Sequence, residues 1–341
     1  MLFDPRPKKS RKELFNRAKE LRLLDESAVA GDPLVVVTGI RRIGKTSLLL
    51  SFLEKWNGIY VDLRGVAMTR DLYDRISEGL TSRVQRLRRL LKNIHGVKVM
   101  GIGVEVKWRG RDSVSLIGLL EQIDRTGERF LLVLDEAQAT KPPVSAELKR
   151  TIAYAYDNLD NITVVISGSE IGVLHKFIGT DDPESMLYGR YIKEVEVERF
   201  TREQSLQFLK AGFSEQGFKP NLDTLREAVS IFDGIVGWLV FFGKSYVEGK
   251  RNTRDIVEMA VRTARKELGR LGKRERLVLK AITRGAKSWG RVKKYMEERE
   301  GVTIPKSSLS RTISKLEKLS IIKQYKFLDP IYEIAARELH T

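Results

Sequence analysis

The first two hundred residues alternate between short apolar runs and longer segments with helical spacing. Leu34–Thr38 is a β-branched run that ends at a glycine-bounded loop, and a helical pattern begins near Lys45. Further strand-like runs occupy 58–62, 130–135, 163–167 and 192–197, and helical patterns occupy about 71–93, 113–125 and 145–159. This alternation predicts an α/β fold of three layers, with a parallel sheet and right-handed crossovers.

One segment interrupts the alternation. Val97–Met100 and Val104–Lys107 alternate apolar and polar residues at period two, on either side of Gly101 and Gly103. Such a pattern around a glycine-rich turn predicts a β-hairpin. We expect an insertion near 96–108, whose purpose the pattern leaves open.

Helical patterns dominate the chain after about Phe200. Segments near 203–210, 221–230 and 238–246 predict a small helical lid. Three more helices are expected at 273–283, 288–300 and 307–319, followed by two short strands at 321–328 and 331–334 around a turn at Pro330. This order is typical of a winged helix. We therefore expect an α/β core at 1–200, a lid at 201–268 and a winged helix-turn-helix at 269–341.

Charge sharpens the expected role of the last unit. The 341 residues carry a formal net charge of +17, and the segment from Arg265 onward holds 20 Lys and Arg against 9 Asp and Glu. A basic excess of this size favours polyanionic partners.

The chain has no Cys, which excludes disulfides and thiolate metal sites. No apolar run reaches about 18 residues and the N-terminus is charged, so we expect a cytoplasmic location and no membrane contact.

The strongest chemical motif is a phosphate-binding loop. The run from Gly39 to Thr46 matches GxxxxGK[ST] between a predicted strand and a predicted helix. In that context backbone amides surround the phosphates, Lys45 neutralises charge and Thr46 offers its hydroxyl to Mg²⁺. The alternative is a glycine turn beside a surface lysine. The expected ATP- or ADP-binding residues are Gly39, Ile40, Arg41, Arg42, Ile43, Gly44, Lys45, Thr46 and Ser47.

An acidic pair follows the apolar run at 130–135. Asp135 would stand at the end of a buried strand beside the phosphates and is expected to hold Mg²⁺ together with Thr46. Glu136 comes next and is the candidate general base for the attacking water. A strand that meets a solvated turn is the alternative explanation.

Two further residues are candidates for catalysis. Ser167 ends the next predicted strand, where a hydroxyl could orient the water near the γ-phosphate, although it could equally cap the strand. Arg190 is a candidate arginine finger, because a planar guanidinium suits developing phosphoryl charge. Its alternative is an ordinary solvated arginine.

These motifs resemble the archaeal ATPase family of P-loop proteins, which is related to AAA+ and STAND ATPases and carries a C-terminal winged helix. The resemblance rests on residues 15–21, 39–47, 60–64, 134–138, 166–169 and 189–190. It implies that the box from Phe15 to Leu21, including Arg17, lies near the adenine and that Gln138 lies near the phosphates. Relatives commonly carry proline where this chain has Val236, which puts a nucleotide contact from that position in doubt.

The third helix of the winged unit has two faces. Leu309, Ile313, Leu316 and Leu319 form its apolar stripe. The residues left outside are basic or hydroxylic, and the candidate nucleic-acid contacts among them are Lys306, Ser308, Arg311 and Lys315. Such a helix could enter the major groove of double-stranded DNA, or the unit could pack on its own ATPase or another protein.

Three functions remain open from the sequence. The first is a slow Mg-ATP-hydrolysing switch that controls how the lid and the winged helix are held. The second is a DNA-binding protein that uses ATP only as a conformational ligand. The third is a STAND-like signalling ATPase whose winged helix binds protein. A homo-oligomer is compatible with each, and the oligomeric state would decide whether Arg190 acts on its own nucleotide or a neighbour's.

Overall fold

A five-stranded parallel sheet organises the N-terminal half of the computed structural model, which describes residues 1–179 and 182–339. Its strand order is β2-β5-β6-β1-β7. The bounds are β1 Leu34–Thr38, β2 Gly58–Asp62, β5 Phe130–Asp135, β6 Ile162–Gly168 and β7 Lys193–Glu196. The strands expected from the apolar runs are thus present, and the fold is α/β with the strand order of AAA+ proteins.

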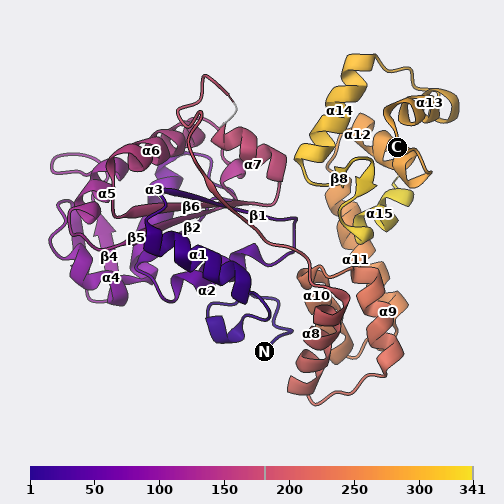
Figure 1. Cartoon of the computed structure of the whole chain (residues 1–341), viewed down its shortest axis with the longest axis horizontal. Coiled ribbons are helices and arrows are strands. Elements are labelled where there is room, and N and C mark those ends of the chain that lie inside the picture. Colours follow the sequence, from indigo (N-terminus) through magenta and orange to yellow (C-terminus); the bar gives the residue numbers. More distant parts are fainter. Residues whose placement is uncertain (180–181, 340–341) are drawn as a thin grey trace.

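Helices cover both faces of this sheet (Figure 1). Alternate residues of β1 face opposite ways, so that Val35 and Val37 pack with α1 and α2 while Leu34 and Val36 pack with the helices of the other face. The helices of the core are α1 Ala18–Ala30, α2 Lys45–Leu53, α3 Thr69–Ser82, α4 Val84–Leu91, α5 Leu116–Asp124, α6 Val144–Asn158 and α7 Ile171–Ile178. Every residue of β1, β5 and β6 is buried, as expected for parallel strands between two layers.

The helix expected at 71–93 is wrong in one respect, since it is two helices. Arg83 interrupts it with φ −117° and ψ 11°, which lie outside the α-helical region. The hairpin follows as β3 (Val97–Met100) and β4 (Gly103–Val106), paired antiparallel, at the residues where the period-two pattern predicts it.

Four helices form the lid: α8 Arg202–Glu215, α9 Leu222–Phe232, α10 Val236–Val247 and α11 Thr253–Leu268. The Thr201 side chain accepts from the amide of Gln204, and the Gln204 side chain accepts from the amide of Thr201. This reciprocal capping box fixes where α8 begins. Two glycines of the lid, Gly212 and Gly243, make room for the Phe3 ring of the N-terminal segment.

The winged helix comprises α12 Lys273–Thr283, α13 Trp289–Glu300, α14 Lys306–Lys318, β8 Ile322–Lys323, β9 Lys326–Phe327 and α15 Pro330–Arg337. The strand expected at 331–334 is wrong, because α15 occupies these residues. Asp329 caps this helix by accepting from the Ile331 amide, and Pro330 stands in its first turn, where a missing N–H costs nothing. Residues 340 and 341 of the expected third unit lie outside the described residues.

The lid and the winged helix share one hydrophobic core. Ile256 and Ala264 of α11 belong to the same buried cluster as Ile331 and Ala335 of α15. The C-terminal end of α14 also packs on α7 of the ATPase core, which Figure 1 shows beside it. Among the described residues, no helix combines the length and the apolar character needed to cross a bilayer.

Candidate functional site

The phosphate loop connects β1 to α2. Gly39 and Gly44 have φ of 150° and 98°, values that a side chain disfavours, so both glycines are required by the backbone. Lys45 is only 5% exposed, and its Nζ donates to the carbonyls of Gly39 at 2.8 Å and Ile40 at 3.1 Å. Burial lowers the pKa of Lys45 to about 8, against the opposing attraction of Glu136 and Asp135. Its ammonium is therefore poised to gain from an incoming anion.

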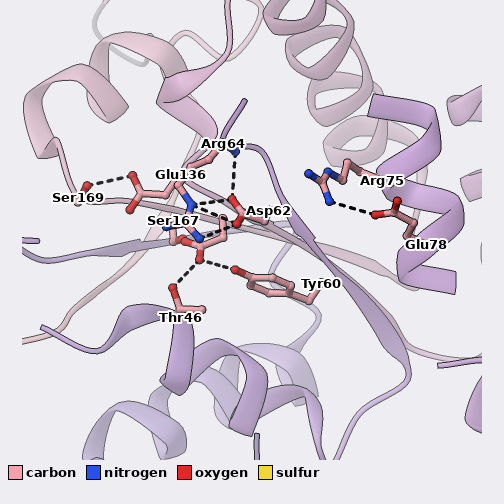
Figure 2. A network of polar contacts seen from close by, with 10 residues as sticks. Thr46, Tyr60, Asp62, Arg64, Arg75, Glu78, Glu136, Ser167 and Ser169 are labelled. Atoms are coloured by element: carbon pink, nitrogen blue, oxygen red, sulfur yellow. Dashed lines mark hydrogen bonds and ion pairs between the residues drawn. The ribbon is translucent and has the colours of Figure 1, made fainter. Parts of the chain in front are cut away.

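Asp135 collects three hydroxyl groups at the end of β5. The hydroxyls of Thr46 and Tyr60 each donate to its Oδ2 at 2.7 Å, and Ser167 donates to its Oδ1. Figure 2 shows this group with Thr46 on α2 and Tyr60 on the neighbouring strand β2. Burial raises the pKa of Tyr60, and the nearby carboxylates of Asp135 and Asp62 raise it further. The phenol therefore keeps its proton and remains a hydrogen-bond donor. Asp135 is fully buried, so these donors stand in for the water it has lost.

Glu136 points from the same strand end toward the phosphate loop's side of the sheet. Its backbone has φ 56°, an uncommon conformation for a residue with a side chain. Its Oε2 accepts from Ser169 Oγ at 2.9 Å and from Gln138 Nε2 at 2.6 Å. The carboxylate is therefore held in place by residues that follow β6 and β5. Lys45 lies close enough that the charge of Glu136 acts to raise its pKa.

A cavity of about 810 Å³ lies between the core and the lid. Its lining includes the charged and polar residues Arg41 to Ser47, Arg64, Glu136 and Ser169, together with the apolar residues Phe15, Phe200, Phe208, Val236, Trp238, Val240 and Phe241. A pocket of this size, lined by both charged and aromatic side chains, suits a nucleoside phosphate. Val236 is among the lining residues, so the position at which relatives carry proline lies at the cavity.

Arg17 also lines the cavity. It is 5% exposed, its Nη2 donates to the carbonyl of Ile43 at 3.1 Å, and its Nη1 pairs with Glu20 at 2.8 Å. Its guanidinium also stands 4.6 Å from the centre of the Phe200 ring. The side chain thus connects the N-terminal box to the phosphate loop and to the lid's entry segment.

Arg41 and Arg42 point away from the loop toward the C-terminal half. Arg42 Nη2 pairs with Glu267 of α11 at 2.5 Å, and its guanidinium stacks 4.1 Å from the Trp238 ring. Arg41 lies 3.6 Å from Glu267 and 3.9 Å from Glu170. These two arginines therefore bridge the loop to the lid as well as lining the cavity.

Ser167 and Arg190 occupy different surroundings from those expected of them. Ser167 is fully buried under Asp135, and Ser169, two residues on, is the hydroxyl that lines the cavity and meets Glu136. Arg190 pairs with Asp157 and covers the Tyr156 ring on α6, and it does not line the cavity. Both roles remain predictions: Ser167 is connected to the phosphate loop only through Asp135, and Arg190 lies away from the cavity.

The winged-helix candidates are only partly free. Lys306 and Arg311 are exposed on α14, Ser308 is half-buried, and Lys315 pairs with Glu275 of α12. At the other end of the helix, Lys318 approaches Gly172 of α7 so closely that a Cβ there would lie 2.7 Å from the Lys318 Cα. The exposed N-terminal half of α14 is thus the part available to a partner.

The donor set suits Mg²⁺ with a nucleotide. No group of three or more His, Cys, Asp or Glu gathers at one place within residues 1–179 and 182–339. The Thr46 hydroxyl and the Asp135 carboxylate offer two oxygen donors at the loop, which fits the preference of Mg²⁺ for one or two protein oxygens with phosphates and water completing its shell.

Sequence reasoning missed several residues of this site. Tyr60, Ser169 and Arg64 lie in runs that were recognised without a role for each, and only the fold brings them to Asp135, Glu136 and the cavity. Glu267 and Tyr332 carried no local signal, because their partners are more than 60 residues away in the chain.

Comparison with known proteins places this geometry in a family. Residues 14–242 match the ATPase domain predominantly from Archaea, and residues 272–334 match the C-terminal winged helix-turn-helix domain of MCM proteins. An ATP-binding protein of Pyrococcus abyssi (strain GE5 / Orsay) is 27% identical over 223 residues, which make up 58% of this chain and 63% of that protein. The match thus spans less than two thirds of that relative.

Two solved structures are similar over most of the chain. A Walker-type ATPase of Pyrococcus abyssi has a TM-score of 0.85 and 32% identity, covering 99% of this chain and 100% of that one. Cdc6p from Pyrobaculum aerophilum has a TM-score of 0.51 and 18% identity, covering 94% and 90%, which shows a common fold alone. Since the family match takes in well over half of the chain, including the phosphate loop, the acidic pair and most of the lid, this chain belongs to the family of ATPase domains found predominantly in Archaea.

Proposed function

We propose that the chain hydrolyses Mg-ATP and uses the nucleotide as a switch for its winged helix. The observation that carries the proposal is the hydrogen bond between Thr46 and Asp135 beside a cavity that Thr46 and Glu136 line together with aromatic side chains. The phosphate loop would be enough for nucleotide binding alone. The second carboxylate, Glu136, is what supports hydrolysis.

Each residue has a distinct part in this reaction. Lys45 gives its ammonium to the phosphate oxygens in place of the carbonyls of Gly39 and Ile40. Thr46 and Asp135 hold Mg²⁺, which neutralises phosphate charge when bound. Glu136, positioned by Ser169 and Gln138, orients the attacking water and accepts its proton.

A chain of contacts supports the switch. Glu267 accepts from Arg42 of the phosphate loop and from the hydroxyl of Tyr332 on α15, at 2.5 Å each. Burial alone would raise the pKa of Glu267, but the hydrogen bonds from Arg42 and Tyr332 outweigh it and the pKa falls. A charged Glu267 therefore joins the nucleotide loop to the winged helix through one carboxylate.

A second link reaches the winged helix from Glu136. Ser169 holds that carboxylate, and two residues later the amide of Ile171 donates to Ser320 Oγ at 2.9 Å, at the end of α14. Movement of Ser169 on nucleotide binding would thus be felt where α14 rests on α7. Both links end on the winged helix, so we propose that its docking responds to the nucleotide.

Turnover measurements test this function. We expect Lys45→Ala to lose nucleotide binding, and Glu136→Gln to keep binding while phosphate release falls by about 10²-fold or more. Binding is read with a fluorescent ATP analogue and turnover by phosphate release. Parental turnover in both variants would refute the site. Parental turnover in Glu136→Gln, with binding lost in Lys45→Ala, would keep the nucleotide site but refute Glu136 as its general base.

Double-stranded DNA is the second part of the proposal, supported by the exposed Lys306 and Arg311 on α14. Replacing both by Gln should weaken duplex binding and make its salt dependence shallower by up to about 2 in slope. Equal affinities would instead favour a STAND-like role in which the winged helix binds protein or another copy of the chain. We place the proposed unit boundaries at 200 and 268, although the shared core joins the lid and winged helix physically.

A further inference from the structure

A second basic region lies far from the winged helix along the chain. Residues 83–111 contain nine Lys and Arg against one acidic residue, Glu105. They form α4, the β3–β4 hairpin and the segment after it. Figure 1 places α4 and β4 at the end of the core opposite to the lid and the winged helix. Nothing in the proposed ATPase reaction uses this region.

Two of the nine cations already have a structural task. Arg83 donates to the carbonyls of Leu53 and Trp56, and Arg86 donates to those of Glu54 and Lys55. They thereby satisfy carbonyls at and just beyond the C-terminal end of α2. The remaining seven are exposed and define what we call the hairpin surface: Arg88, Arg89, Lys92, Lys98, Lys107, Arg109 and Arg111.

The hairpin surface differs from the other charged faces of the same molecule. On α3 and α13, Arg and Lys side chains form ion pairs with glutamates of the same helix, as Arg75 does with Glu78 and Lys294 with Glu298. Within the part of the chain that the structure describes, none of the seven cations has a carboxylate within ion-pair distance. The one acidic residue, Glu105, stands opposite Lys98 in the hairpin register. An uncompensated cluster raises its own electrostatic energy, which an external polyanion would relieve.

The cations sit on a firm base. Leu87, Leu90 and Leu91 of α4 and Val104 of β4 are buried in the main core. Trp108 stacks on Tyr73 of α3 at 4.6 Å, with 10° between the rings, and its Nε1 donates to Ser77 Oγ at 2.9 Å. A hairpin and helix anchored in this way hold their charges at fixed spacing, so little ordering entropy is lost on binding.

The tip of the hairpin narrows the choice of polyanion. Met100 is 58% exposed and Ile102 is 81% exposed at the turn, while the aromatic side chain nearest to them in sequence, Trp108, is packed on Tyr73. Membrane-binding tips rely on exposed aromatic side chains at the interface. Two aliphatic side chains amid cations suit a nucleic acid instead, since they can contact sugars and base edges while Lys and Arg meet phosphates.

We propose that the hairpin surface binds the phosphate backbone of nucleic acid, independently of the winged helix. Its contacts are to phosphates and carry no base sequence, so binding falls steeply with salt. The two basic regions lie at opposite ends of the molecule, so one chain could hold two segments of a duplex at once.

The test is a salt titration of an unrelated 30-base-pair duplex with the full chain carrying Arg88→Gln, Arg89→Gln and Lys92→Gln together. The matched control removes three exposed lysines of the lid region, Lys210, Lys219 and Lys250, in the same way. A third variant carries Lys306→Gln and Arg311→Gln. Vesicles of phosphatidylserine are titrated in parallel.

We expect the hairpin variant to bind the duplex roughly tenfold or more weakly at 0.1 M salt, with a slope shallower by up to about 2.7, and the lid control to match the parent. Parental affinity and slope in the hairpin variant would overturn the proposal, as would vesicle binding without duplex binding. Loss in the hairpin variant alone, with the winged-helix variant unchanged, would support this surface and refute the winged-helix contact.

Discussion

A buried ion pair stands beside the phosphate loop. Arg17 and Glu20 form an ion pair in which both side chains are almost fully buried, and Arg17 also caps the phosphate loop at the Ile43 carbonyl. Burial lowers the pKa of Arg17 despite the pull of Glu20. Such a pair is costly to break from one side, because the charge left behind has no solvent.

We expect Arg17→Met to lower the free energy of unfolding by about 3 kcal/mol, and Glu20→Leu added to it to restore a large part of that loss. Urea unfolding of the single and double variants measures the coupling. Arg75→Met is the control, since Arg75 and Glu78 are exposed at the same i,i+3 spacing and their pair is worth less than about 1 kcal/mol. Equal losses at both sites would contradict a buried, coupled pair.

At this scale the sequence predicts function well where a motif needs consecutive residues. The run from Gly39 to Thr46 and the pair Asp135–Glu136 are local, so their place follows from strand and helix alone. Ser169 was passed over for Ser167 because the sequence does not show where the strand stops. β6 ends at Gly168, so Ser167 stays buried against Asp135 while Ser169 leaves the strand and lines the cavity. Tyr60 and Glu267 depend on strand order and lid placement, which no local pattern reports.

Close backbone approaches decide how the elements of the lid meet the core. Gly234 lies between α9 and α10 with φ 71°, and a Cβ there would stand 2.0 Å from the carbonyl of Phe200. The Phe200 amide donates in turn to the Gly234 carbonyl at 3.0 Å. The segment around Phe200, which leads from the core into the lid, can therefore approach the α9–α10 turn only because Gly234 has no side chain.

Gly234→Ala should destabilise the protein by more than about 2 kcal/mol, because both the left-handed backbone and the contact with Phe200 oppose a Cβ. Gly217→Ala is the matched control, with the same φ of 71° and open space around it, and it should cost roughly 1 kcal/mol. Thermal and urea unfolding compare the two. A loss at Gly234 no larger than at Gly217 would show that this approach is unimportant.

Asp329 gives α15 a pH-dependent cap. Burial raises its pKa, although Trp238 Nε1 and the Ile331 amide donate to it at 2.9 and 2.8 Å and oppose the rise. The folded protein thus holds this proton more tightly than the unfolded chain, so its stabilising contribution is complete below the unfolded pKa and is lost as pH rises through the folded pKa.

Asn at position 329 cannot ionise, and it keeps one of the two acceptor oxygens, so the cost of the lost hydrogen bond does not change with pH. The stability of Asp329→Asn relative to the parent should therefore increase between pH 3 and pH 7, by about 1.4 kcal/mol for each unit by which folding raises the pKa. Urea unfolding across this range measures it, with Asp223→Asn on the exposed start of α9 as control. A difference between variant and parent that stays constant with pH would contradict the raised pKa.

The elements also show why one strand was wrongly expected. Residues 331–334 are apolar enough for a strand, but Asp329 and Pro330 form a helix start, and the helix buries Ile331 and Ala335 against α11. A short apolar run is compatible with either a strand or a helix, and here the burial of one helix face against α11 favours the helix. The break at Arg83 has a similar cause, because its guanidinium is drawn to the carbonyls of Leu53 and Trp56.

At the scale of the molecule, the nucleotide loop is tied to the winged helix by two routes. One passes from Arg42 through Glu267 to Tyr332, and the other from Glu136 through Ser169 and the Ile171 amide to Ser320. The order core, lid, winged helix follows from the sequence, but these contacts join segments up to 290 residues apart. Composition and periodicity carry no information about them.

The central claim, that the nucleotide governs how the winged helix rests on the core, has a direct test. The chain contains no Cys, so Ala146→Cys on α6 and Arg299→Cys on α13 accept two spin labels without further changes. We predict that Mg-ATP shifts the distribution of distances between the labels, and that the shift disappears when Lys45→Ala is added. An unchanged distribution with and without saturating Mg-ATP would contradict the account.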